Sequence, residues 1–198
     1  DFIQFYPYLP HFIELSIDIV SGMRLQAGAL RHIGGSNRTI IKQVYEMLVS
    51  ERTALADAAV GTLVSIDRIF DLIGEKLPTQ RKDDIRDIEN KWPNDPWPLK
   101  VAKAITLLEF VRSVPRTEKN LAALLFNAVD AGSCLPEVER AIGLLHEKQF
   151  IRQTEDGWKL LTDQEKNWTV ERNSISPTPK ERRDIIEDMF RTSFSEPS

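Results

Sequence analysis

The sequence predicts a mainly helical fold, in which a helical lid-like bundle is followed by a winged helix (three helices plus a β-hairpin) and a C-terminal helical extension. Apolar residues recur at the spacing of an amphipathic helix through most of the 198 residues. Two short extended runs flank the turn Glu155-Asp156-Gly157. This is a strong hairpin signal because glycine tolerates the positive φ of a tight turn.

Clusters of proline and glycine interrupt the helical spacing and divide the chain into four segments. We expect the bundle over residues 1–76, a connector over 77–96, the winged helix over 97–162 and the extension over 163–198. The boundary before the winged helix rests on the run from Trp92 to Pro98, whose three prolines are expected to exclude regular structure.

The bundle is expected to contain three helices. The segment 10–23 is dense in apolar residues and suits a largely buried helix. The pair Gly34-Gly35 then breaks the chain, and a second helix follows to about Val49. After the extended pair Leu63-Val64, Ser65 is expected to cap a third helix. The inner face of that helix is formed by Ile66, Ile69, Phe70 and Ile73.

The winged helix is expected to begin with a helix over residues 99–111, then a second one capped by Thr117, then a third over residues 135–148. The strands of the wing are residues 150–154 and 158–161. In the extension, residues 164–172 and 180–190 are predicted to be helical. The apolar residues of the last helix are Ile185, Ile186, Met189 and Phe190.

Composition limits the classes of function. The net charge of −4 and the isoelectric point of about 5.5 give no overall attraction to nucleic acid or to an anionic membrane. No apolar run is long enough to span a bilayer and no signal peptide opens the chain, so we expect a cytoplasmic protein without a membrane partner. Cys134 is the single cysteine, which excludes an internal disulfide. Because the chain begins at Asp1 rather than methionine, we expect a piece of a longer protein.

The third helix of a winged helix often reads DNA, so its charge bears on that function. Its carboxylates outnumber its cations. The acidic residues are Glu137, Glu139 and Glu147, and the basic ones are Arg140 and Lys148. Glu155 and Asp156 at the tip of the wing would also repel phosphates. DNA is therefore a disfavoured partner, and docking on a protein is favoured. The candidate contacts to a partner or nucleic acid are Arg140, Lys148 and Lys159.

Basic residues next to the second helix are interpreted differently. The basic residues stand among carboxylates, and we expect all of them to form a solvated surface of mixed charge. They are Arg112, Arg116 and Lys119, beside Glu109 and Glu118.

The segment Gly34-Gly35-Ser36-Asn37-Arg38 carries sharper chemistry. A glycine break before a helix start directs unpaired backbone N–H groups outward, and Arg38 falls in the first turn. Such a helix end can bind an anion, with the arginine contacting phosphate oxygens. An ordinary capped helix with an exposed arginine is the alternative, and local sequence alone favours it.

The chain carries no complete catalytic site. It has no GxxxxGK[ST] phosphate loop and no HExxH motif. A metal site is not expected, because His11, His32 and His146 lie in separate elements. A Cys–His pair is not excluded, although Cys134 is interpreted as a helix-start residue. We expect no catalytic residue, metal or cofactor within this segment.

Several segments together resemble a known family. They are Tyr6 to His11, Gly34 to Ile40, Leu63 to Ile73, Gly157 to Thr162 and Gln164 to Trp168. This succession is similar to the region after the nucleotide-binding core in the large P-loop ATPases of bacterial BREX phage-defence systems and related uncharacterised ATPases. More distantly, it resembles the lid and winged helix of origin-recognition-type AAA+ proteins.

The resemblance implies a non-catalytic regulatory and interaction segment of a larger P-loop ATPase, which couples nucleotide state to partner contacts in phage defence. In AAA+ ATPases an arginine at the start of a lid helix reaches the γ-phosphate, and Arg38 matches that placement. ATP and Mg²⁺ would be bound by the core of the parent ATPase. The partners would be the rest of that ATPase and other proteins. A DNA-binding winged-helix regulator is the alternative, and a purely structural scaffold for a partner protein is a weaker one.

Overall fold

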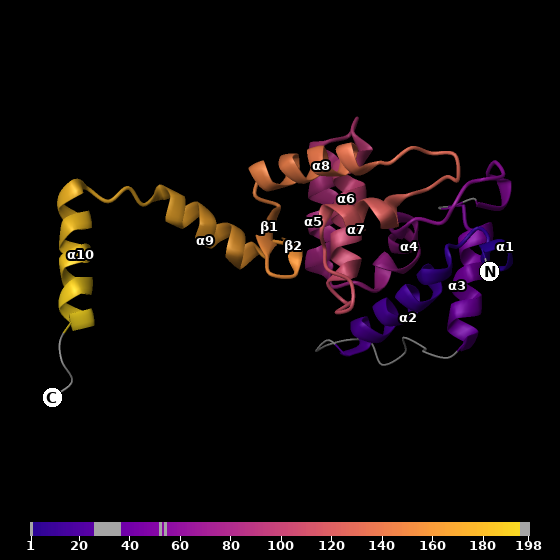
Figure 1. Cartoon of the computed structure of the whole chain (residues 1–198), viewed down its shortest axis with the longest axis horizontal. Coiled ribbons are helices and arrows are strands. Elements are labelled where there is room, and N and C mark those ends of the chain that lie inside the picture. The colour runs from indigo at the N-terminus through magenta and orange to yellow at the C-terminus, as the bar shows by residue number, and fades with distance from the viewer. Residues whose placement is uncertain (1, 26–36, 52, 54, 195–198) are drawn as a thin grey trace. The chain divides into compact units, whose positions relative to one another are not determined.

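The computed structural model describes residues 2–25, 37–51, 53 and 55–194 (Figure 1). The chain forms two compact units, residues 1–160 and residues 161–198. The prediction of a mainly helical fold with a hairpin is confirmed.

The helices of the first unit are α1 (Phe2–Phe5), α2 (Pro10–Leu25), α3 (Asn37–Val49), α4 (Ile66–Ile73), α5 (Thr79–Lys91), α6 (Pro96–Leu108), α7 (Glu118–Leu125) and α8 (Leu135–Glu147). Short 3₁₀ turns are η1 (Leu55–Asp57) and η2 (Gly74–Lys76). The strands are β1 (Ile151–Thr154) and β2 (Gly157–Leu160). The second unit contains α9 (Asp163–Ser174) and α10 (Pro179–Phe194).

Helix α6 is the central element of the first unit, where it contacts α4, α5, α7, α8 and β2 (Figure 1). Its fully buried side chains are Val101, Ala102, Ala104, Ile105, Leu107 and Leu108. Ala102 and Leu107 lie on other sides of the helix than Ile105 and Leu108, since each residue turns a helix by about 100°. The helix is therefore covered on more than one side. The segments predicted as bundle, connector and winged helix contribute to a common core.

Helix α6 begins at Pro96, earlier than predicted. The expectation that the proline run excludes regular structure is wrong for Pro96 and Pro98, which lie in the first turn of α6. The first backbone N–H groups of a helix have no partner within it, so a proline there removes no helical hydrogen bond. Asp95 caps the helix, and its carboxylate accepts a hydrogen bond from the N–H of Trp97 at 3.2 Å.

Helix α4 begins after Ser65, as predicted, but the hydroxyl of Ser65 does not cap it. It donates instead to the carboxylate of Asp67 at 2.5 Å. A carboxylate is a strong hydrogen-bond acceptor for a nearby hydroxyl. The preceding pair Leu63-Val64 lies in neither a helix nor a strand, and its backbone bonds to distant segments. The N–H of Leu63 donates to Asn127 at 2.8 Å and that of Val64 donates to Pro7 at 3.0 Å.

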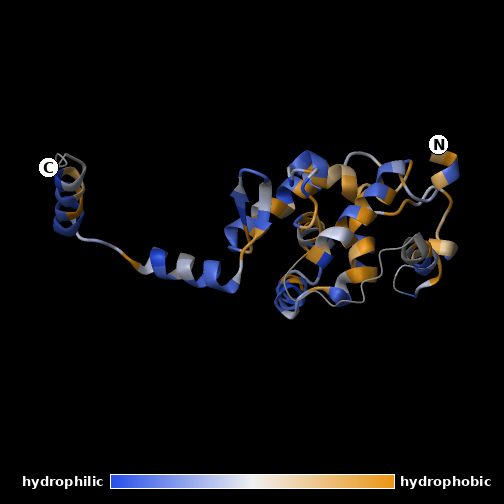
Figure 2. Cartoon of the chain, turned by 90° about the horizontal axis from the view of Figure 1, so that it is seen from below, coloured by the Kyte–Doolittle hydropathy of each residue, from blue (hydrophilic) through white to orange (hydrophobic). Residues whose placement is uncertain are grey.

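The hairpin pairs β1 and β2 antiparallel, with Ile151 opposite Leu160 and Thr154 opposite Gly157. The inward side chains Ile151 and Leu160 are buried, whereas the hairpin as a whole is mostly hydrophilic (Figure 2). Gly157 has a φ of +94°, which confirms the predicted need for glycine after the tip.

The loop between α6 and α7 adds a third segment to this sheet, which the sequence did not indicate. The N–H of Arg116 donates to the carbonyl of Asp156 at 2.8 Å, and the N–H of Trp158 donates to the carbonyl of Arg116 at 3.0 Å. The wing is therefore joined to the backbone that precedes α7.

In the second unit, α9 begins with a capping box. The N–H of Glu165 donates to the hydroxyl of Thr162 at 3.2 Å, and the carboxylate of Glu165 accepts from the N–H of Thr162 at 2.8 Å. Helix α10 is amphipathic, as predicted. Four of its described apolar side chains are more than half exposed, and they are Ile185, Ile186, Met189 and Phe190.

Gly157→Ala should destabilise the first unit by about 1–3 kcal/mol. Alanine would have to adopt the positive φ of this position, and its Cβ would clash with the backbone of Arg116. Gly143→Ala on α8 is the matched control, because its Cβ meets nothing within 4 Å. The control should be neutral or stabilising by up to about 1 kcal/mol. Urea unfolding of both variants measures the difference, and equal midpoints would contradict the role given to Gly157.

Candidate functional site

Helix α8 is held on the start of α6 by an ion pair. The guanidinium of Arg140 donates two hydrogen bonds to the carboxylate of Asp95, at 2.6 and 3.0 Å. The same carboxylate caps α6 through Trp97. The hydrogen bond from Arg140 lowers the pKa of Asp95 below its ordinary value. Arg140, a predicted contact residue, is thus engaged within the chain and only about half exposed.

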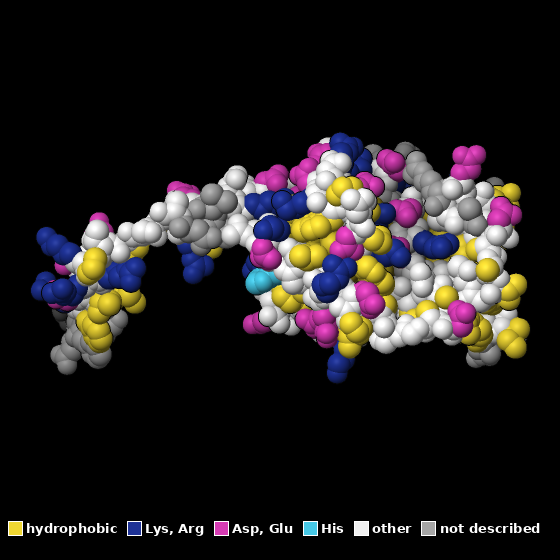
Figure 3. Space-filling model, turned by 90° about the horizontal axis from the view of Figure 1, so that it is seen from above, with side chains coloured by type: hydrophobic (Ala, Val, Ile, Leu, Met, Phe, Trp, Pro, Cys, Tyr) yellow, Lys and Arg dark blue, Asp and Glu magenta, His cyan; other side chains and the backbone are white. Residues whose placement is uncertain are grey.

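The outward face of α8 carries more negative than positive charge. Its exposed residues are Pro136, Glu139, Arg140, Gly143, His146 and Glu147. Arg140 pairs with Asp95, and the ammonium of Lys148 lies 2.7 Å from the carboxylate of Glu147. Glu139 adds a further negative charge. On the face drawn in Figure 3, Lys and Arg side chains are interspersed with Asp and Glu rather than gathered in one broad field.

Arg116 fixes the wing from below. The expectation that it belongs to a solvated surface is wrong, because only 9% of the residue is exposed. Its Nε donates to the carbonyl of Trp158 at 2.7 Å. The backbone of Arg116 pairs with the hairpin, so its side chain lies within reach of the Trp158 carbonyl. This carbonyl replaces water as the hydrogen-bond acceptor.

Trp158 connects the wing to the two helices that precede it. Its indole N–H donates to Glu118 on α7 at 2.8 Å. Its ring lies edge-on to the ring of His146 on α8, with the centroids 5.5 Å apart. The wing is therefore oriented by contacts with both helices as well as by Arg116.

Glu109 ties the wing to α5, and it too was expected to be solvated. Its carboxylate accepts a hydrogen bond from the N–H of Leu160 at 3.2 Å and pairs with Arg81 at 3.1 Å. Arg81 also pairs with the buried Asp84 at 3.3 Å. Burial raises the pKa of Glu109, and the charge of Arg81 opposes that rise. The local sequence could not indicate this burial, because Arg81 lies 28 residues from Glu109 on another helix.

The outer face of the hairpin carries two cations. Arg152 and Lys159 stand directly opposite each other in the two strands. Arg152 is exposed and Lys159 is partly buried, while Glu155 and Asp156 at the tip are exposed. The three predicted contact residues thus lie on two elements. Arg140 lies on α8, Lys148 lies at the end of that helix, and Lys159 lies on β2.

The predicted anion site at Arg38 is not tested by the structure. Arg38 lies in the first turn of α3, whose backbone is described. Its side chain, like the residues Gly34, Gly35 and Ser36, lies outside the described part of the chain. The phosphate-sensing role therefore stays a prediction.

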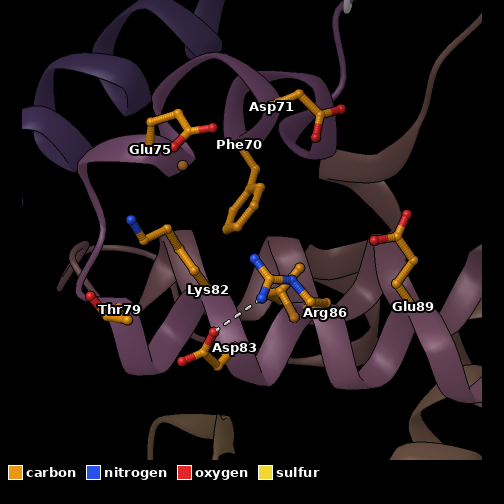
Figure 4. Close-up of a pocket in the computed structure, with 10 residues that line it drawn as sticks. Phe70, Asp71, Glu75, Thr79, Lys82, Asp83, Arg86 and Glu89 are labelled. Carbon is orange, nitrogen blue, oxygen red and sulfur yellow. Dashed lines mark ion pairs between the residues drawn. The ribbon is translucent and has the colours of Figure 1, made fainter.

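A groove of mixed charge lies between α4 and α5 (Figure 4). Asp71 and Glu75 lie on the α4 side, Lys82 and Arg86 lie on α5, and the ring of Phe70 lies between the two sides. Asp71 pairs with Lys103 of α6 at 2.6 Å. Its lining carries more carboxylates than cations, because Asp83 and Glu89 add to Asp71 and Glu75, so the groove does not favour an anion.

The described residues lack two kinds of feature. None of their helices is both long enough and apolar enough to cross a bilayer. Nor do three or more His, Cys, Asp or Glu side chains gather among them in a way that could hold a metal ion.

No protein-family model matches the chain, and no solved structure gives a significant match.

Asp95→Asn should remove the ion pair to Arg140 while retaining a good N-cap residue. The folded-state pKa of Asp95 is lowered, so the stabilisation is present above the unfolded pKa of about 4 and is lost as pH falls through the folded value. Near neutral pH the variant should be less stable by less than about 1 kcal/mol, because the pair is partly exposed.

The measurement is the thermal unfolding midpoint of both proteins from neutral pH to below about pH 4. The gap between them should narrow as the pH falls. Asp83→Asn, which removes a longer pair with Arg86 on α5, is the control and should produce a smaller gap at neutral pH. A constant gap for Asp95→Asn would contradict the assigned role of the ion pair.

Proposed function

We propose that this chain is a non-catalytic regulatory and interaction module in which α8 and the wing dock on protein. The observation that carries the proposal is the pairing of Arg140 with Asp95, together with the carboxylates that remain on the outward face of α8. A surface with matched charges and few free cations suits a protein partner better than a polyanion.

Affinity for DNA depends on lysines and arginines that neutralise phosphates and release counterions. To contact a phosphate, Arg140 would have to leave two hydrogen bonds to Asp95. Glu139 and the wing-tip residues Glu155 and Asp156 would oppose the approach of the backbone. Each of these effects disfavours groove reading by α8.

The position of the docking surface also supports this role. The wing is attached through Arg116, Glu109 and Trp158 to α6, α5 and α7. A surface that is already ordered before binding loses little conformational entropy when a partner docks.

The resemblance extends this proposal to a larger assembly. We propose that the module belongs to a cytoplasmic P-loop ATPase of the phage-defence type, whose other domains and partner proteins it contacts. ATP and Mg²⁺ would be held by the core of that ATPase. Arg38, at the start of α3, would sense the γ-phosphate and couple nucleotide state to those contacts.

A DNA-binding winged-helix regulator is the second candidate, and one observation favours it. Arg152 and Lys159 lie opposite each other on the wing. Two cations on one face of the hairpin can contact phosphate oxygens of a nucleic acid backbone.

DNA binding separates the two candidates. At about 0.15 M salt, the chain should bind a labelled duplex no more tightly than about 10⁻⁶ M, the range of non-specific contacts, in fluorescence anisotropy. Glu139→Lys on α8 and the control Glu187→Lys on α10 should raise this weak affinity equally. A dissociation constant near 10⁻⁸ M for one sequence, or a larger gain for Glu139→Lys alone, would favour the regulator.

Arg38→Ala in the longer ATPase should lower the rate of ATP turnover by about a hundredfold, because an arginine that stabilises the transferring phosphoryl group contributes at least that much. The matched control is Lys42→Ala, one turn further along α3, where the lysine pairs with Glu46 at 3.4 Å. Steady-state hydrolysis with circular dichroism as a check of folding measures both. Unchanged turnover in Arg38→Ala would remove the sensor role.

A further inference from the structure

A hollow of about 610 Å³ opens at the corner between α7 and α8, on a different set of residues from the outward face of α8. Most of its lining is apolar. These side chains are Leu9, Ala122, Ala123, Phe126 and Leu135. Ala122 of α7 is buried, and its small side chain leaves room at the base. The volume falls in the range of pockets that accept a small ligand or a few side chains.

The rim of this hollow favours a negative charge. Its ionisable lining residues besides Cys134 are Lys119 and His11, and the described residues that line it include no Asp or Glu. Two other hollows, between α4 and α5 and beneath the wing, are lined by both signs. A carboxylate placed at this rim would meet Lys119 without first displacing another carboxylate from the lining.

His11 and Lys119 contribute differently to the rim. The imidazole of His11 packs on the ring of the fully buried Phe12, with the centroids 4.9 Å apart. Burial lowers the pKa of His11, so its ring is mostly neutral at neutral pH. Lys119 therefore supplies the positive charge, and His11 can serve as a hydrogen-bonding group.

We propose that this hollow is a docking site for a segment of a partner protein in which a bulky apolar side chain stands within one turn of a carboxylate. The proposal rests on the interaction role proposed above and adds the chemistry of the partner. A peptide fits better than a lipid because Ala123, Ser133, His11 and Lys119 are exposed, so the rim is open. The space suits one or two side chains rather than an enclosed acyl chain.

Cys134 provides a reporter inside the hollow, since it is the single cysteine of the chain and lines the wall. Its Sγ donates to the carbonyl of Ala122 at 3.3 Å. Burial raises the pKa of this thiol, while the charges of Glu137 and Lys100 act on it in opposite directions. A raised pKa slows thiolate attack, so binding is better measured at equilibrium than from rates.

Disulfide exchange makes this measurement. The Cys134 thiolate attacks a disulfide that joins a peptide cysteine to 2-mercaptoethanol. A protein–peptide S–S bond forms, the 2-mercaptoethanol thiolate leaves, and no net oxidation occurs. The probes are Cys-Gly-Leu-Leu-Asp, Cys-Gly-Leu-Leu-Lys and Cys-Gly-Ser-Ser-Asp, applied to the full chain. Intact-protein mass spectrometry gives, for each peptide, the concentration of 2-mercaptoethanol at which half of the protein carries the peptide.

The expected order follows from burial and charge. The Leu-Leu-Asp peptide should withstand about tenfold more 2-mercaptoethanol than Ser-Ser-Asp, because it buries apolar side chains. It should withstand about threefold more than Leu-Leu-Lys, because its carboxylate meets Lys119 in a partly exposed pair. Lys119→Glu should reverse the order of the two Leu-Leu peptides. Lys82→Glu, the same charge change in the α4–α5 groove, should leave the order unchanged.

Equal values for the three peptides, or an order that Lys119→Glu does not alter, would overturn the proposal. So would a Cys134 that exchanges with no peptide in the folded chain but exchanges with all of them in urea, because the hollow would then be closed. The DNA-binding measurement concerns α8 and the wing. A chain that fails the exchange test while still binding DNA only weakly would lose this docking site and retain its proposed function.

Discussion

The structure depends on the burial of α6 from several sides at once. Helices α4 and α5, which precede it, and α7, α8 and β2, which follow it, all pack against it. A fully buried aliphatic side chain contributes about 1.5–3 kcal/mol relative to an exposed one, and Leu107 and Leu108 are both fully buried. Neither group of neighbours could bury α6 alone, so the winged helix and the preceding helices stabilise each other.

The wing inherits its position from this core. Arg116 and Glu109 reach it from the segment just after α6, and Arg81 links Glu109 to α5. Buried charges of this kind are costly unless their partners are in place. Here backbone groups and an ion pair satisfy them, which holds the hairpin beside α8 in one arrangement. The mixed-charge surface proposed for docking is consequently formed by elements that do not have to be assembled when a partner arrives.

Local signals made most of the helices, the hairpin and the outward face of α8 predictable, but not α1 or α5, which lies in the segment expected to be a connector. The cap at Thr117, the Asp156-Gly157 turn and the spacing of apolar residues each depend on neighbours within one or two turns. The partners of the charged residues were not predictable. Arg140 finds Asp95 across 45 residues and Arg81 finds Glu109 across 28, so single-sequence charge counts could not show which cations are engaged. The hollow at the α7–α8 corner has the same origin, because Leu9 and His11 come from far upstream.

The proline run before α6 has a consequence for how this segment could be joined to other genes. By composition it resembles a linker at which recombination would be harmless, yet Pro96 and Pro98 already belong to the central helix. A crossover there would separate α6 from α5 and expose apolar side chains of α6 to water. A crossover after Leu160 falls between two compact units instead, so shuffled descendants would be expected to share residues 1–160 as one inherited block.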